Sequence, residues 1–249
     1  MKLEQVIAER KTKTVYRDGD KCIKVFNTNY AKADILNEAL NQARVEDLGL
    51  NVPKILEVTT VEGRWAIVSE YIEGTTLSHL MRDDPASENA CVEQLVDTQM
   101  LIHTKRSPLL SRLKDKMNRK ILAADLDPVT RYELLIRLEG LPNHDKLCHG
   151  DLCPSNIIRT PEGALYVIDW AHATQGNASA DVARTYLTFH LSGRAEIAER
   201  YLDLFCEKSG TEKRYVQKWM PIVAASQSVK GNLEERDFLL RWATVADYE

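Results

Sequence analysis

Asp151, Asn156 and Asp169 are three polar residues whose types and spacing suit phosphoryl transfer. The first two lie in the segment His-Gly-Asp-Leu-Cys-Pro-Ser-Asn, which predicts a loop that presents one carboxylate and one amide. The amide of Asn156 and the carboxylate of Asp169 supply hard oxygen ligands, which Mg²⁺ prefers. Asp151 then remains available as a general base that accepts the proton of an attacking hydroxyl group.

A hairpin between this loop and Asp169 must bring the polar groups together. Residues 157–158 (Ile-Ile) predict a short buried strand, residues 160–163 (Thr-Pro-Glu-Gly) predict a turn, and residues 165–168 predict a second strand. The paired strands would return Asp169 to the side of the loop. The predicted metal site therefore depends on this hairpin.

The motif His-Gly-Asp-x-x-x-x-Asn, the hairpin and the following Ile-Asp-Trp resemble the catalytic segment of the aminoglycoside phosphotransferase and choline kinase family. That family shares the two-lobed fold of protein kinases. The resemblance implies transfer of the γ-phosphate of ATP, or of GTP, to a hydroxyl group of a small molecule, with Mg²⁺ on Asn156 and Asp169. Protein kinases more often show His-Arg-Asp and Asp-Phe-Gly, where this chain has Gly150 and Trp170.

The expected fold is therefore α+β, with a small antiparallel sheet and a helix in an N-terminal lobe (1–73) and a mainly helical C-terminal lobe (74–249). The pattern predicts strands at 3–9, 14–17, 22–26, 54–58 and 65–70, with a hairpin turn at Asp18-Gly19-Asp20. It predicts helices at 31–46, over much of 75–141 and from 194 onward. The helix at 31–46 has apolar residues at helical spacing, namely Ile35, Leu36, Ala39, Leu40 and Ala43.

Lys24 lies on the third predicted strand, between Ile23 and Val25. It matches the lysine that contacts the α- and β-phosphates in the resembled family. Such a lysine needs a carboxylate partner, and the following helix offers Glu38, with Glu46 as a competitor two turns further along. We expect Glu38 to be the partner.

Two further segments would contact the nucleotide according to the resemblance. The loop at 9–14 would cover the phosphates; it contains no glycine, but the hydroxyls of Thr12 and Thr14 are candidate ligands. The segment at 69–74 would be the hinge between the lobes, where backbone groups of Glu70 and Ile72 would bind the adenine edge.

Several other residues are expected to support the structure. The resemblance implies that Asp181 caps a helix and braces the catalytic loop by hydrogen bonds. His149 is expected to be a scaffold residue, and His103 and Cys148 are expected to pack in the core. His172, close to Asp169 in sequence, is a second choice as a functional histidine.

Composition excludes some classes of partner. The chain has 249 residues, 44% hydrophobic and 28% charged, with a net charge of −4. There is thus no basic face to bind nucleic acid or an anionic membrane. The N-terminus lacks an apolar signal segment, and the five cysteines show no CxxC spacing, so we expect reduced thiols in a cytoplasmic protein. The oligomeric state stays open.

The acceptor is the least defined part of the prediction. In the resembled family it sits between the catalytic loop and the last helices, where acidic residues outnumber Arg236 and Arg241; these are Glu234, Glu235, Asp237, Asp247 and Glu249. An acidic lining favours a cationic acceptor such as an aminoglycoside or an amino alcohol like choline. Sugar and thiamine-like acceptors fit the same catalytic core.

Two rival functions differ from this prediction by specific features. A protein kinase is disfavoured by Ile-Asp-Trp, by the lack of an Ala-Pro-Glu stretch, and by the short interval between Asp169 and Asp181. A non-catalytic nucleotide-binding scaffold would tolerate loss of Lys24, Asp151 or Asp169, and all three are present.

Overall fold

The computed structural model describes residue 3 and residues 5–229 and 233–244. The chain forms two compact units, one from Met1–Ser87 and Pro154–Ala173, the other from Glu88–Cys153 and Thr174–Glu249. The chain therefore leaves the first unit, returns to it for twenty residues and leaves again. The functional lobes expected at 1–73 and 74–249 stay a prediction.

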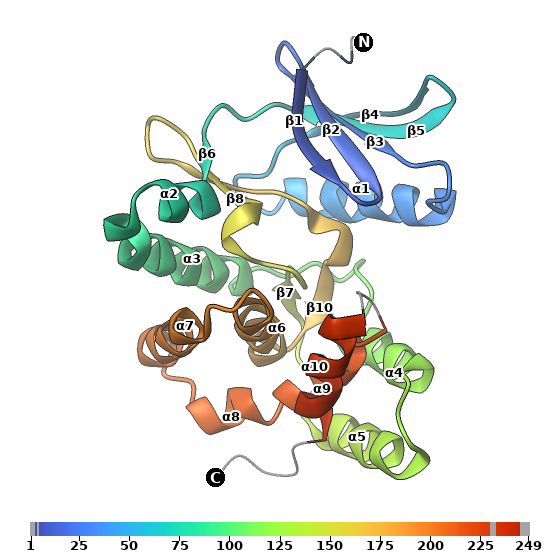
Figure 1. Cartoon of the computed structure of the whole chain (residues 1–249), viewed down its shortest axis with the longest axis vertical. Coiled ribbons are helices and arrows are strands. Elements are labelled where there is room, and N and C mark those ends of the chain that lie inside the picture. The colour runs from blue at the N-terminus through green and yellow to red at the C-terminus, as the bar shows by residue number, and fades with distance from the viewer. Residues whose placement is uncertain (1–2, 4, 230–232, 245–249) are drawn as a thin grey trace. The chain divides into compact units, whose positions relative to one another are not determined.

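The first unit contains an antiparallel sheet with strand order β1-β2-β3-β5-β4, and helix α1 packs on one of its faces (Figure 1). This arrangement confirms the predicted N-terminal sheet and helix. The elements are β1 (Gln5–Arg10), β2 (Lys13–Asp18), β3 (Lys21–Phe26), α1 (Lys32–Glu46), β4 (Ile55–Val61) and β5 (Arg64–Glu70).

The β2–β3 hairpin fixes which side chains share a face of the sheet. Val15 pairs with Lys24, and Thr14 pairs with the fully buried Val25. Directly paired residues point to the same face and successive residues alternate, so Lys13, Val15 and Lys24 share one face. Thr14 lies on the other face.

The prediction for α1 was right in its bounds but partly wrong about its buried face. Leu36 and Leu40 are 43% and 48% exposed, whereas the carboxylate-bearing Glu38 is 3% exposed. The residues that α1 buries are Ile35, Glu38, Ala39, Asn41, Gln42 and Val45. A glutamate can be buried here because Lys24, on the strand that α1 covers, neutralises it.

A second, small sheet of the first unit contains the predicted hairpin. Strand β8 pairs with β9 in the register Ile157 to Val167, and β6 pairs with β8 on its other side. A Cβ at Gly74 would lie 2.5 Å from the carbonyl oxygen of Arg159, so the chain can approach β8 there only as glycine. The elements are β6 (Thr75–Thr76), α2 (Leu77–Asp83), η1 (Pro85–Ser87), η2 (Pro154–Asn156), β8 (Ile157–Arg159), β9 (Leu165–Val167) and η3 (Trp170–His172).

The second unit is mainly helical, as predicted. Asp127 caps α5 by accepting from the amides of Val129 and Thr130, with Pro128 at the first helical position. No helix among the described residues is long and apolar enough to cross a membrane. The elements are α3 (Glu88–His103), α4 (Leu113–Ala123), α5 (Pro128–Gly140), β7 (Lys146–Cys148), β10 (Thr174–Gly176), α6 (Ala178–Leu191), α7 (Ala195–Ser209), α8 (Lys213–Gln217), α9 (Met220–Gln227) and α10 (Leu233–Ala243).

Candidate active site

Lys24 and Glu38 form the expected ion pair in the first unit. The Lys24 ammonium lies 2.5 Å from Glu38 Oε1, and the Glu38 side chain is 4% exposed. Burial alone would lower the pKa of Lys24, but the carboxylates of Asp169 and Glu38 outweigh it and raise this pKa. Lys24 is therefore a fixed positive charge. The competitor Glu46 is engaged elsewhere, since it accepts from the amide of Ile55 at 2.7 Å.

Asp169 joins this pair from the end of the β8–β9 hairpin. Its Oδ1 lies 3.4 Å from Lys24 Nζ, and its Oδ2 lies 3.1 Å from the ammonium of Lys13. Its backbone is left-handed, with φ 66° and ψ 59°. Few residues other than glycine adopt this conformation, and Asp is one of them. At this turn the carboxylate contacts two lysines.

The hairpin also brings Asn156 close to Asp169 along the backbone. The carbonyl of Asn156 accepts from the amide of Ile168 at 3.0 Å, one residue before Asp169. The following segment is anchored as well, because Asn41 donates to the carbonyl of Ala171 and Trp170 is fully buried. The predicted hairpin is therefore confirmed, and it returns the chain to Asn156, the last residue of the predicted loop.

The expected hinge and phosphate-loop residues also lie in the first unit. Glu70 ends β5, and its amide donates to the carbonyl of Lys54 at 3.0 Å. In the part of the chain that the structure describes, the amide of Ile72 has no hydrogen-bond partner. Thr12 is exposed in the β1–β2 turn, whereas Thr14 lies on the face of β2 opposite to Lys13 and Lys24.

Asp151 lies in the second unit, just after β7. The guanidinium of Arg184 donates to Asp151 Oδ1 at 2.9 Å, and the two side chains are 18% and 31% exposed. The amide of Asp151 donates to Nδ1 of the fully buried His149 at 3.2 Å. His149 thus holds the backbone of Asp151, as expected of a scaffold residue, and Arg184 holds its side chain.

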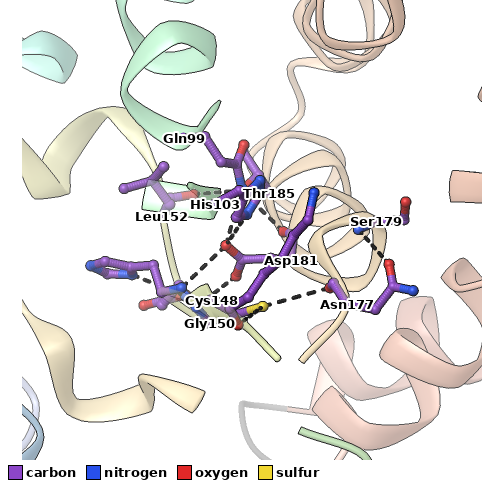
Figure 2. Close-up of polar contacts among 12 residues, drawn as sticks. Gln99, His103, Cys148, Gly150, Leu152, Asn177, Ser179, Asp181 and Thr185 are labelled. Carbon is purple, nitrogen blue, oxygen red and sulfur yellow. Dashed lines mark hydrogen bonds and ion pairs between the residues drawn. The ribbon is translucent and has the colours of Figure 1, made fainter. Parts of the chain in front are cut away.

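A buried carboxylate, that of Asp181, braces this loop (Figure 2). It accepts from the amides of His149 and Gly150 at 3.1 and 2.7 Å, and His103 Nε2 lies 3.0 Å from its Oδ2. Burial raises the pKa of Asp181, but the hydrogen bond and charge of His103, the charge of His149 and the Gly150 amide lower it more, so the net shift is downward. The predicted brace is confirmed.

The predicted capping role of Asp181 is wrong. Asn177 is the N-cap of α6, and its side chain accepts from the amide of Ser179 at 2.9 Å. Asp181 lies four residues further on, inside the first turn and beside the positive end of the helix dipole. Its carboxylate is therefore available to the loop rather than to its own helix.

His103, Cys148 and Asp181 place one ligand atom each within 4.8 Å of one another, yet the group does not suit a metal. The Cys148 thiol is already directed at two backbone carbonyls, those of Lys146 and Asn177, at 3.6 Å each. Both oxygens of Asp181 already accept hydrogen bonds. The three residues form a packed polar cluster, as expected for His103 and Cys148.

Two contacts were not foreseen from the sequence. Arg184 follows Asp181 by three residues on one helix, a spacing that places the two side chains next to each other, but this spacing does not reveal the contact of Arg184 with Asp151. Lys13 lies on the same face of the sheet as Val15, which pairs with Lys24. The register of this pairing follows from the Asp18-Gly19 turn.

We expect Asp181→Asn to lower the free energy of unfolding by about 3 kcal/mol at pH 7, because an amide cannot accept from all of these donors. The folded pKa of Asp181 is lowered, so its stabilisation is fully present above the ordinary pKa of about 3.9 and is lost as pH falls through the folded value. Urea unfolding at pH 7 and pH 3 measures the difference in free energy of unfolding between wild type and the variant. Asp115→Asn, at an exposed aspartate, is the control. An equal difference at both pH values would contradict this.

Comparison with known proteins places this chain in a family. The phosphotransferase enzyme family (APH) matches residues 5–217. A Protein LicA homolog of Mycoplasma capricolum subsp. capricolum is 24% identical over 207 residues, which cover 82% of this chain and 80% of that protein.

Two solved structures share the fold. A thermostable mutant of aminoglycoside phosphotransferase APH(4)-Ia, in complex with AMP-PNP and hygromycin B, has a TM-score of 0.73 and 16% identity and covers 96% of this chain and 94% of its own. Choline kinase LicA from Streptococcus pneumoniae has a TM-score of 0.68 and 19% identity. The match covers 98% of this chain and 92% of the choline kinase chain. The predicted family and fold class are confirmed: the chain belongs to the phosphotransferase enzyme family.

Proposed function

We propose that this chain transfers the γ-phosphoryl group of ATP to a hydroxyl group of a small cationic molecule. The observation that carries the proposal is the cluster of Lys24, Glu38 and Asp169, in which a buried carboxylate fixes a lysine beside a second carboxylate that is 28% exposed. Phosphoryl transfer depends mostly on positioned charge, and this cluster provides it. GTP remains an alternative donor.

Lys24 would bind the α- and β-phosphates, with Glu38 holding its ammonium in place. The backbone of Glu70 and Ile72 would bind the adenine edge; the unpaired amide of Ile72, among the described residues, supports this. Thr12, exposed in the β1–β2 turn, remains a candidate phosphate ligand. Thr14 lies on the face of β2 opposite to Lys13 and Lys24, which argues against the same role for Thr14.

The donor set on the β8–β9 hairpin fits Mg²⁺. Asp169 offers a carboxylate and Asn156 an amide oxygen, and both are hard ligands held by one hairpin. A bound Mg²⁺ would supply charge neutralisation for the phosphates. The chain's own contribution is to hold Asp169 in its left-handed turn, where the carboxylate meets Lys13 and Lys24.

Asp151 would accept the proton of the acceptor hydroxyl. Its side chain is oriented by Arg184 and its backbone by His149, so the carboxylate is held before the acceptor arrives. Asp151 precedes Asn156 by five residues in the chain. The same loop thus links the proposed base to the proposed metal ligands.

A cationic acceptor is supported by the relatives, two of which are named for choline and for aminoglycosides. The acidic residues expected to line its site receive less support. Glu234, Glu235 and Asp237 are exposed on α10, and Asp247 and Glu249 lie outside the described residues. Because Arg184 occupies Asp151 Oδ1, the cationic group of the acceptor would be held away from that oxygen. We also propose a cytoplasmic location.

A panel of acceptors with ATP and Mg²⁺ tests the proposal. Choline, ethanolamine and hygromycin B are compared with the neutral alcohol glycerol and the anionic alcohol glycerate, and the phosphorylated product is detected by mass spectrometry. We expect Mg²⁺-dependent product from at least one cationic acceptor. Product from the neutral or anionic alcohol alone would refute the cationic acceptor. Absence of both product and MgATP binding would refute the kinase.

Asp151→Asn should reduce turnover by about 10²- to 10⁴-fold, because general-base assistance is lost while the nucleotide site is intact. Turnover is measured on the acceptor found in the panel, and MgADP affinity is measured by calorimetry. The control is Asp145→Asn, an exposed aspartate that pairs with Arg106. A variant that keeps wild-type turnover would show that Asp151 is not the base.

The two proposed metal ligands should differ in importance. We expect Asp169→Ala to reduce the gain in ADP affinity that Mg²⁺ provides by about tenfold or more, and Asn156→Ala to reduce it less, because a carboxylate contributes full charge. ADP is titrated with and without Mg²⁺. Metal-free ADP should bind Asp169→Ala at least as well as wild type, since a repelling charge is gone. Equal losses for both variants would contradict the ranking.

A further inference from the structure

Lys13 is a second lysine on the proposed metal carboxylate, and neither the family motif nor the resemblance assigns it a role. Its ammonium lies 3.3 Å from Asp169 Oδ1 and 3.1 Å from Oδ2, so it bridges both oxygens. It is also 3.9 Å from Glu38 Oε1, and its side chain is 17% exposed. Lys13 therefore belongs to the same charge cluster as Lys24.

The charges of the four groups in this cluster balance one another. Two ammonium groups, Lys13 and Lys24, face two carboxylates, Glu38 and Asp169. Asp169 would hold Mg²⁺ through its carboxylate, which the Lys13 ammonium contacts in this structure. An ammonium that bridges both oxygens cannot keep that position beside a divalent cation, because like charges repel at such short range. Lys13 must then find another anion.

The position of Lys13 at the start of β2, directly after the β1–β2 turn, determines which anion that is. The turn that would cover the phosphates contains no glycine, so it lacks the usual close backbone approach. The turn is nevertheless anchored by Asn27. The backbone amide of Asn27 donates to the carbonyl of Thr12, and its side-chain amide donates to the carbonyl of Lys11, at 2.9 Å each. Lys13 is the first residue of β2, directly after this anchored turn. It lies on the same face of the sheet as Lys24.

We propose that Lys13 is a nucleotide-binding residue that exchanges partners. Without nucleotide it occupies Asp169 in place of the metal, and with MgATP it moves to the β- and γ-phosphates. A charged side chain would thereby replace the glycine-rich backbone contacts that this loop lacks. The inference rests on the proposed function, because it takes ATP and Mg²⁺ as the ligands of the first unit.

The exchange predicts that the Lys13→Met substitution changes the affinities for MgADP and for Mn²⁺ in opposite directions. Affinity for MgADP should fall about tenfold, the usual effect of losing one charge-assisted hydrogen bond. Affinity for Mn²⁺ alone, a magnetic substitute for Mg²⁺, should rise severalfold, because the competing ammonium is gone. Calorimetry measures MgADP binding, and electron paramagnetic resonance measures free Mn²⁺.

Lys218→Met is the control, because Lys218 is an exposed lysine of the second unit and is not among the proposed nucleotide-binding residues. It should bind both ligands as wild type does. Lys13→Arg keeps the charge and should restore most of the MgADP affinity. Thermal unfolding of each variant confirms that the fold is retained.

Three results would overturn the exchange. Lys13→Met could bind MgADP as tightly as Lys218→Met does, it could lose affinity for Mn²⁺ as well as for MgADP, or Lys13→Arg could fail to restore MgADP binding. Failure of wild type and Lys218→Met to bind MgADP at all would instead overturn the proposed function, and the inference with it. The two failures are therefore distinguishable.

Discussion

The carboxylate of Glu38 is buried against the sheet of the first unit, and the position of Lys24 depends on it. A buried carboxylate without a partner costs several kcal/mol, so α1 can pack this face only if a cation meets Glu38. Lys24 is that cation, from the strand that α1 covers. Helix, strand and charge are thus mutually dependent. The same ion pair aims an ammonium at Asp169, which arrives from a hairpin more than a hundred residues later in the chain.

The second unit uses a buried carboxylate in a comparable way. Asp181 fixes the backbone before Asp151 through two amide hydrogen bonds, and the surrounding polar side chains, among them His103, satisfy its remaining acceptor capacity. Neither Glu38 nor Asp181 is proposed to react. Each instead holds a more exposed group, Lys24 in one unit and Asp151 in the other, in a defined orientation. In a reaction driven by positioned charge, such supports are as important as the residues they hold.

Much of this arrangement could be predicted from the sequence because local signals agreed. The Asp-Gly turn, the alternation around Lys24 and the Thr-Pro-Glu-Gly turn specify hairpins, and hairpins fix register. The family motif pointed to Glu38 over Glu46. The buried face of α1 was predicted poorly, because hydrophobic spacing assigns leucines to the core and takes no account of a paired glutamate. The role of Asp181 as a cap was also wrong, since Asn177 competes for that position with equal propensity.

The long-range contacts between side chains could not be predicted in the same way. That Arg184 lies on Asp151, and that Lys13 lies on Asp169, depends on the path of the chain between them rather than on local propensity. The strand register did contain part of the information, since counting back from the turn places Lys13 on the face shared with Lys24. The acceptor site offers no comparable local rule, because acidic residues on an exposed helix are ordinary.

A double-mutant cycle on MgADP affinity tests most directly whether Glu38 acts through Lys24. Wild type, Lys24→Met, Glu38→Gln and the double variant are compared by calorimetry. If Glu38 serves only to hold Lys24, each single variant loses affinity and the double variant is no weaker than Lys24→Met, so the two effects are strongly non-additive. Losses that add, or a Glu38→Gln variant that binds MgADP as wild type does, would contradict the account.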